Sequence, residues 1–247
     1  KRDIVFVATA DEEGNIMKGA MKALETGYVT GNSYVIDHEP SGGDIYVAHK
    51  GKTWFSITVQ GAQAHGSMPW NGIDAIAGMA EVILGIKKRI EALPVDKAFG
   101  KSSVCFGTIE GGFNTNVVAE SCTITIDMRL APPLTSKGSL EIVEEALKDA
   151  CHRVPGLTGD YKVIAQRPYV LQDDGSVLLR ELQKIIKEET GKYAETPVFT
   201  GYTDSGVIAA ETGNINCMSY GPKGMDYHQA NEYVDLDSVL EVYETVK

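Results

Sequence analysis

The most constraining feature of this sequence is a series of six segments between residues 53 and 165, each with the periodicity of either a strand or a helix. Four segments place apolar and polar side chains in turn, which is the period of a half-buried strand. These expected strands are residues 54–59, 103–109, 122–128 and 161–165. Two segments repeat apolar residues at helical spacing instead, and they cover residues 73–90 and 139–151. The order is therefore strand, helix, strand, strand, helix, strand.

This order predicts a compact ferredoxin-like unit, a four-stranded sheet with two helices on one face. The flanking segments predict an ordinary α/β alternation. Their expected strands are 4–9, 34–36 and 218–220, and their expected helices are 17–24, 176–190 and 238–246. The predicted fold class is thus α/β, with an α/β domain formed by residues 1–50 and 169–247. The ferredoxin-like βαββαβ domain, residues 51–168, is inserted into it.

Charge and composition exclude several function classes. A net charge of -11 and a pI near 4.9 disfavour nucleic acid as a partner, since binding to phosphate backbones depends on basic patches. No run of 18 apolar residues predicts a membrane span, and the first residues lack the pattern of a signal peptide. The four cysteines are widely spaced and form no Cys-x-x-Cys pair, which favours a reducing, cytoplasmic location.

Acidic residues follow two of the expected strands. Glu12 and Glu13 come after the first strand, and Asp37 and Glu39 come after the second. Ligands of open α/β sheets gather outside the carboxyl ends of strands, so both groups could share one site. One carboxylate could hold a metal while another accepts a proton from water. The alternative is that Glu12 and Glu13 only place negative charge in the first turn of a helix.

Isolated basic residues offer weaker indications. His228 lies in a glycine-rich loop and His65 lies among small residues, so each could serve a site or simply be exposed. Arg129 ends an expected strand, where it could clamp a carboxylate or pair with a surface acid. His38 and His49 lie near the acidic residues, but neither has the i, i+4 spacing of a helical zinc site.

Taken together and in order, several motifs resemble a family of zinc metallopeptidases. The family contains acetylornithine deacetylase, succinyl-diaminopimelate desuccinylase, carboxypeptidase G, aminoacylase and peptidase T. The resemblance spans nearly the whole chain. The motifs that carry it are residues 10–14 (Ala-Asp-Glu-Glu-Gly), 39–44 (Glu-Pro-Ser-Gly-Gly-Asp), 64–69 (Ala-His-Gly-Ser-Met-Pro), 111–118, 127–129, 203–206 and 227–232.

The resemblance implies roles for the acidic residues and for one histidine. Glu12 matches the family's general base and Glu13 matches a zinc ligand. Glu39 matches the ligand of the other zinc, although Asp37 competes for that role because some relatives use an earlier Asp. His228 matches the last zinc ligand. Two zinc ions per subunit are therefore expected, with cobalt or manganese as substitutes.

The resemblance also implies residues that touch the substrate. His65 matches a histidine that reaches across a dimer to polarise the scissile carbonyl. Asn116, Arg129 and Asp204 match positions that bind substrate. The expected activity is hydrolysis of an amide or peptide bond in a small peptide or N-acyl amino acid. The inserted domain would act as the lid and as the surface of a homodimer.

One departure from the family leaves a second hypothesis open. The family carries a His-x-Asp motif before the paired glutamates, and no His-x-Asp occurs among the five histidines of this chain. We expect that the sequence is truncated at its N-terminus. The alternative is a fragment or a non-catalytic relative that serves as a dimerising or peptide-binding module.

Overall fold

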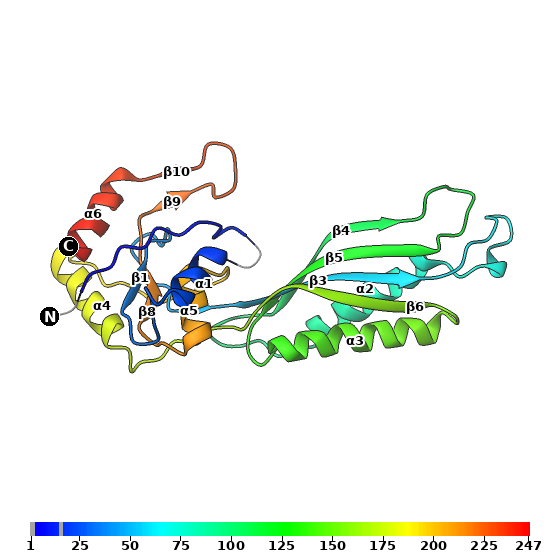
Figure 1. Ribbon diagram of the computed structural model, residues 1–247, viewed down its shortest axis with the longest axis horizontal. Coiled ribbons are helices and arrows are strands. Elements are labelled where there is room, and N and C mark those ends of the chain that lie inside the picture. The colour runs from blue at the N-terminus through cyan, green and yellow to red at the C-terminus, as the bar shows by residue number, and fades with distance from the viewer. Residues whose placement is uncertain (1–2, 15–16) are drawn as a thin grey trace. The chain divides into compact units, whose positions relative to one another are not determined.

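The computed structural model describes residues 3–14 and 17–247. It divides into two compact units, which we treat separately (Figure 1). The first unit comprises residues 1–50 and 169–247, and the second comprises residues 51–168. Asn15, which belongs to the acidic turn singled out in the sequence, lies outside the described residues.

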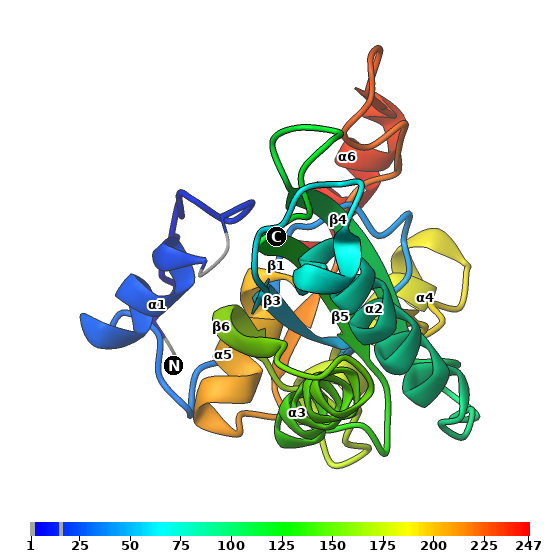
Figure 2. The same cartoon turned by 90° about the vertical axis from the view of Figure 1, so that its right-hand side faces the viewer.

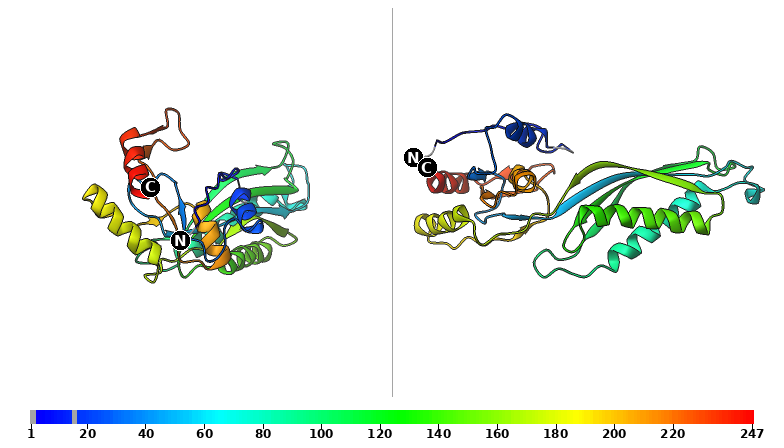
Figure 3. Two further views of the ribbon diagram at one scale, coloured as in Figure 1. Left: turned by 60° about the vertical axis from the view of Figure 1, so that its left-hand side comes forward. Right: turned by 60° about the horizontal axis from the view of Figure 1, so that its bottom comes forward.

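The second unit contains the predicted βαββαβ order. Its elements are β3 (Gly51–Gln60), the short 3₁₀ helix η1 (Pro69–Asn71), α2 (Ala75–Glu91), β4 (Ser103–Gly111), β5 (Ser121–Leu130), α3 (Ser136–Arg153) and β6 (Thr158–Arg167). The strands form one antiparallel sheet in the order β4-β5-β3-β6, and α2 and α3 lie along one face of it (Figure 3). The ferredoxin-like prediction is confirmed.

Alternation along the central strands creates the core of this unit. Phe55, Ile57 and Val59 of β3 are buried, whereas the residues between them are partly accessible. The same alternation runs through β5, where five apolar side chains from Cys122 to Leu130 are buried. Because successive side chains of a strand point to opposite faces, one face of the sheet packs on the helices.

The two helices are joined to each other as well as to the sheet (Figure 2). Arg89 of α2 donates hydrogen bonds to Glu145 and Asp149 of α3, at 3.0 and 2.7 Å. Each helix begins at a residue whose side chain accepts from backbone N–H groups, Asp74 for α2 and Thr135 for α3. Such caps satisfy donors that have no partner inside the helix.

The first unit is built from shorter elements. They are α1 (Lys18–Glu25), β1 (Val35–Asp37), β2 (Ala48–His49), α4 (Val177–Thr190), β7 (Val198–Phe199), α5 (Asp204–Thr212), β8 (Cys217–Ser219), β9 (Gly224–Met225), β10 (Tyr233–Val234) and α6 (Leu236–Val246). Two parallel pairs, β1 with β8 and β2 with β7, join segments about 150 residues or more apart. All three helices predicted outside the insertion are present, as α1, α4 and α6.

The strand predicted at residues 4–9 is wrong. Within the described residues no strand or bridge pairs with this segment, and Ile4 and Phe6 are 99% and 89% exposed. A strand gains its backbone hydrogen bonds from a neighbour, so an apolar run without a pairing partner stays irregular. The end of the segment still packs on the unit, because the side chain of Thr9 lies against Gly19 at the start of α1.

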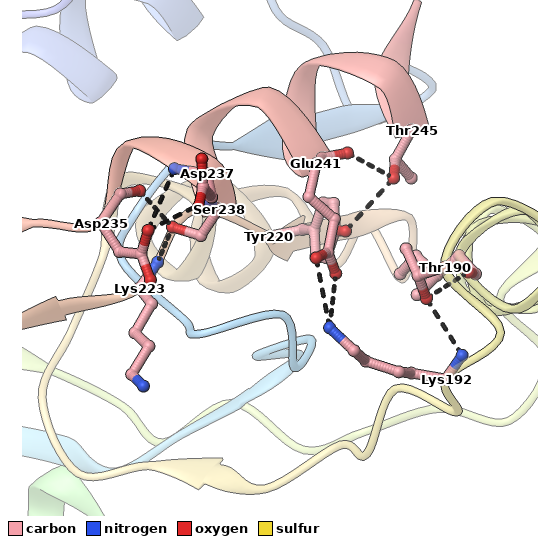
Figure 4. Close-up of polar contacts among 10 residues, drawn as sticks. Thr190, Lys192, Tyr220, Lys223, Asp235, Asp237, Ser238, Glu241 and Thr245 are labelled. Atoms are coloured by element: carbon pink, nitrogen blue, oxygen red, sulfur yellow. Dashed lines mark hydrogen bonds and ion pairs between the residues drawn. The ribbon is translucent and has the colours of Figure 1, made fainter.

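Polar contacts fasten α6 to its neighbours (Figure 4). Lys192, which follows α4, donates to both carboxylate oxygens of Glu241 at 3.2 Å. The buried Tyr220 hydroxyl donates to Thr245 at 3.4 Å, and Thr245 donates back to the carbonyl of Glu241. Asp235 caps the helix by accepting from the N–H groups of Asp237 and Ser238. The final helix is thus tied to both α4 and the end of β8.

None of the helices formed by the described residues combines the length and apolar character needed to cross a membrane. All four cysteines are free thiols.

The core of the second unit yields a stability prediction. Ile57→Ala deletes a fully buried side chain, and we expect it to lower the free energy of unfolding by about 2–5 kcal/mol through lost burial and a residual cavity. The protein's two tryptophans, Trp54 and Trp70, both lie in this unit, so urea unfolding followed by tryptophan fluorescence reports on it. Ile109→Ala, at a position 62% exposed, is the control and should change stability by about 0.5 kcal/mol or less. Equal losses in both variants would contradict the assignment of the core.

Candidate functional site

Five carboxylates of the first unit converge at the carboxyl end of β1. Glu12 and Glu13 come from the turn before α1, Asp37 ends β1, Glu39 follows it, and Asp204 begins α5. Glu12 is within electrostatic reach of the other four. Residues separated by up to 192 positions in the sequence therefore form one acidic cluster, and we call these five side chains the carboxylate cluster.

Burial and mutual repulsion shift the titration of the cluster. Burial, followed by the charges of the other four members, raises the pKa of Glu12 to about 8. Burial and then the neighbouring charge of Asp37 raise the pKa of Glu39 to about 7. Burial also raises the pKa values of Asp37 and Asp204. The cluster thus favours protons or another positive charge.

His228 approaches the cluster from the loop between β9 and β10. Its Nδ1 lies 3.7 Å from a carboxylate oxygen of Glu13, and its charge lowers the pKa of Glu39. The backbone of His228 has a positive φ of 61°. Asp226 and Asn231 in the same loop also have positive φ angles, of 58° and 68°. A non-glycine residue in this conformation is uncommon, so the surrounding structure holds the loop in place. The His228–Glu13 pair is well exposed and contributes little to stability.

The donor types of the cluster match those of a divalent metal site, since carboxylate oxygens and imidazole nitrogens are zinc ligands. Across residues 3–14 and 17–247, however, no three His, Cys, Asp or Glu side chains are arranged as a group that could hold a metal ion. Glu13 and His228 are the predicted ligands that lie side by side. The chemistry of the donors fits a metal, while the described side chains supply only part of a ligand set.

Glu12 and Glu13 do not act as helix-terminal charge. The helix that follows them begins at Lys18, four residues after the turn, and no acidic residue lies in its first turn. The alternative interpretation of these two residues is therefore wrong. The expectation that they open a helix directly after a strand is wrong too, because the turn is preceded by an irregular segment.

Asp37 is held from the interior of the unit. The backbone N–H of Ser205 donates to its Oδ2 at 3.2 Å, and the Ser219 hydroxyl donates to the same oxygen at 3.3 Å. Ser205 lies in the first turn of α5, where N–H groups and the helix dipole favour an anion. Glu39 makes no such bonds to α5, so the two competitors for one role differ in their anchoring. Neighbouring His38 places Nδ1 2.9 Å from the carbonyl of Tyr220.

His65 and Asn116 lie together in the second unit. A backbone bridge joins His65 to Val117, and the N–H of Gly66 donates to the carbonyl of Asn116 at 2.7 Å. The N–H of Ser67 donates to Nδ1 of His65 at 3.2 Å, so that nitrogen carries the lone pair. A neutral His65 therefore carries its proton on Nε2, which makes Nε2 a hydrogen-bond donor.

Arg129 lies at the other end of the same sheet. With a rise of about 3.3 Å per residue, it is roughly 26 Å along β5 from Ser121, the residue of that strand nearest to Asn116 in the sequence. Its guanidinium donates to Oδ2 of Asp127 at 2.8 and 3.1 Å, so it pairs with an acid of its own strand. The structure therefore does not bring Arg129 to His65 and Asn116 within one unit.

Sequence reasoning missed a buried polar network beside the cluster. The side chains of Thr203, Ser205 and Ser219 contact one another and reach from Asp37 to the ring of His49. Serine and threonine are too common for such a set to be identified by pattern. The one available signal was the Thr-Asp-Ser-Gly segment at residues 203–206, which is typical of a capped helix start.

Comparison with known proteins finds a matching family and several relatives. Residues 47–155 match a family described as the peptidase dimerisation domain, of the M20 group. Acetylornithine deacetylase of Buchnera aphidicola is 27% identical over 246 residues, which cover 97% of this chain and 61% of that protein. The chain therefore spans about three fifths of the length of that relative.

Solved structures share the fold. A tripeptidase from Staphylococcus aureus matches with a TM-score of 0.80 at 22% identity, and the aminopeptidase PepT from Bacillus cereus matches with 0.78 at 22%. Each match covers 96% of this chain and 61% of the other. Residues 47–155 carry the peptidase dimerisation domain of the M20 group, and nearly the whole chain is similar to acetylornithine deacetylase, so the predicted family resemblance is confirmed.

The carboxylate cluster predicts a distinct dependence of stability on pH. The pKa values of Glu12 and Glu39 rise from 4.5 to about 8 and about 7 on folding, so folding favours their protonated forms. Their contribution to stability is complete below about pH 4.5 and is lost as the pH rises through 7 to 8. In a chelator, the metal-free protein should therefore melt at progressively lower temperature between pH 5 and 8.

Glu12→Gln should flatten this dependence, because an amide cannot ionise. Glu181→Gln, on the exposed side of α4, is the matched control and should melt as the parent does. Differential scanning calorimetry at four pH values between 5 and 8 measures the effect. If Glu12→Gln and the parent lose stability in parallel, Glu12 is not part of a repelling cluster.

Proposed function

We propose that this protein is a zinc-dependent hydrolase that cleaves an amide or peptide bond in a small peptide or N-acyl amino acid. The observation that carries the proposal is the carboxylate cluster, whose burial and repulsion raise the pKa values of Glu12 and Glu39. A buried group of like charges is costly unless a cation balances it. The names of the relatives, a deacetylase and a tripeptidase, favour amide substrates.

Glu13, Glu39 and His228 would hold the metal, with Asp37 as the competitor for Glu39. Their donors suit zinc, and cobalt or manganese could substitute. When bound, the metal supplies Lewis acidity that polarises the scissile carbonyl and lowers the pKa of water. The active molecule would hold two zinc ions per subunit, with further ligands from outside the described residues.

Glu12 is the proposed general base. Its side chain is only partly buried, so one side of Glu12 remains open to a substrate and to water. Its environment raises its affinity for a proton, which a base needs in order to take a proton from the attacking water. The same carboxyl group then delivers that proton to the leaving amine. A nearby cation would return its pKa toward neutrality or below.

His65 and Asn116 are the proposed donors to the developing oxyanion. Their proximity and the Nε2 proton of His65 suit this role. Arg129 would bind a substrate carboxylate from the far end of the same sheet, and the buried Asp204 would lie beside the substrate in the other unit. A rigid sheet cannot bring both of its ends to one small substrate, which supports a homodimer in which the partner supplies His65 and Asn116. The protein would carry out this hydrolysis in the cytoplasm.

A second candidate function rests on the incomplete ligand set among the described side chains. The chain would then serve as a dimerising or peptide-binding module through residues 51–168. Metal analysis and activity separate the two functions. A dimer that retains no zinc and cleaves none of the substrates below is the module.

The catalytic role of Glu12 is tested in the full-length protein loaded with zinc. Hydrolysis of a dipeptide, a tripeptide and N-acetyl amino acids is measured for the parent and for Glu12→Gln. We expect kcat to fall by about 10²- to 10⁴-fold, the usual contribution of a general base, with zinc content unchanged. Glu181→Gln is the surface control. A Glu12→Gln protein with nearly normal kcat would exclude Glu12 as the base.

The shared site predicts complementation between two inactive variants. His65→Ala should lose about 10²- to 10³-fold in kcat, as oxyanion donors do. When Glu12→Gln and His65→Ala dimers are mixed and allowed to exchange subunits, half of the dimers are mixed. Each mixed dimer has one intact site, so activity should return to roughly a quarter of the parent's. No recovery after proven subunit exchange would show that His65 acts within its own subunit.

A further inference from the structure

We propose that His49 is a buried positioning residue, which acts through the hydroxyls of Thr203, Ser205 and Ser219 to fix the orientation of Asp37 in the carboxylate cluster. This inference rests on the proposed function, because it assigns the cluster a supporting layer. None of the four residues touches a substrate in the proposed reaction.

The network begins at a histidine enclosed in the first unit. His49 is 1% exposed, and its backbone N–H and carbonyl pair with Val170 at 3.0 and 2.9 Å. Its ring lies 5.8 Å from the rings of Phe199 and Tyr202. A Cβ atom added to Gly206 would come within 3.2 Å of the ring. The imidazole is therefore held in one orientation by packing on several sides.

From the ring, three hydroxyls lead to the carboxylate cluster. Nε2 of His49 lies 3.0 Å from Oγ1 of Thr203, and that oxygen lies 2.8 Å from Oγ of Ser205. Oγ of Ser205 lies 2.8 Å from Oγ of Ser219, and Ser219 reaches Oδ2 of Asp37 at 3.3 Å. All three hydroxyl-bearing residues are fully buried.

Each hydroxyl of the network makes more than one polar contact. Ser219 donates to Oδ2 of Asp37 and lies within hydrogen-bond distance of both other hydroxyls. Thr203 already accepts the N–H of Gly206 at 3.2 Å. Oγ1 of Thr203 also lies 3.1 Å from Oγ of Ser219, so this one hydroxyl contacts the ring of His49, the backbone of Gly206 and both serines. The three hydroxyls thus form a continuous link between the ring of His49 and Asp37.

The surroundings keep His49 in its neutral form. Burial lowers its pKa to about 4, so the ring carries a single proton at neutral pH. A buried polar network costs free energy unless all of its members are satisfied, and apolar side chains would fill the same volume without that cost. The network leads to Oδ2 of Asp37, which leaves Oδ1 as the oxygen that can act on a ligand.

The first test asks whether the ring of His49 senses the far end of the network. The ring ¹⁵N chemical shifts of His49 report which nitrogen carries the proton, and they are measured in the metal-free protein at pH 7. We expect Ser219→Ala and Thr203→Val to change these shifts and Thr203→Ser to preserve them. Ser139→Ala, which removes an equally buried hydroxyl in the second unit, should have no effect. Folded Ser219→Ala and Thr203→Val proteins with parental His49 shifts would overturn the proposal.

The second test asks whether the network acts on the cluster. Zinc affinity is measured by competition with a chromophoric chelator in the full-length protein. We expect Ser219→Ala and Thr203→Val to weaken binding by about tenfold, and Thr203→Ser and Ser139→Ala to bind as the parent does. Unchanged affinity in both hydroxyl-deleting variants would overturn the positioning role. A parent that binds no zinc would instead refute the metal site of the proposed function, and the ¹⁵N shifts alone would then decide whether the network exists.

Discussion

The parallel pairing of β1 with β8 is the interaction on which the candidate site depends. Its register sets Asp37 opposite Ser219, although the two residues are 182 positions apart in the sequence. The N-terminus of α5 then adds the N–H of Ser205 to the same carboxylate. Glu39 follows Asp37 by two residues, so it lies near the same end of β1. Glu12, in the turn before α1, is within electrostatic reach of both. A three-residue strand thus determines where five negative charges meet.

This concentration of charge works against the stability of the empty fold. Water would solvate these carboxylates better than the half-buried site does, and each one disfavours ionisation of the next. Groups with strongly shifted pKa values cluster at functional sites, because stability there is given up for reactivity or ligand affinity. A divalent cation reverses the balance, since the same repulsion becomes attraction. The electrostatic cost of the cluster is therefore the physical basis of its proposed affinity for metal.

The second unit has the opposite character. Its sheet has strands of nine or ten residues and packs on a continuous apolar core, and Arg89 of α2 pairs with two acidic residues of α3. Such a sheet holds two groups of polar residues at a constant separation, with His65 and Asn116 at one end and Arg129 at the other. A rigid spacer of this kind is suited to presenting its two ends to two different sites. The same geometry would suit the proposed roles of this domain in substrate binding and dimerisation.

Much of the fold follows from local patterns in the sequence. The βαββαβ order was predictable because apolar residues recur every two positions in its strands and about every 3.6 positions in its helices. Each of these elements buries one apolar face. The segment at residues 4–9 shows the limit of this reasoning, because an apolar run becomes a strand only where another backbone is available to pair with it. The short pair of β2 with β7 depends on contacts between residues 150 positions apart and left no such pattern.

The site divides in the same way. The sequence by itself determined which residue types were available for chemistry, because motifs such as the paired glutamates and the loop of His228 are contiguous. Only the tertiary structure decided that Glu12, Asp37, Glu39 and Asp204 share one environment, that Arg129 stands apart from His65, and that His49 reaches Asp37 through three hydroxyls. Charge repulsion, burial and hydrogen bonding act through distances of a few ångströms in space. Those distances exist only after strands far apart in the chain have paired.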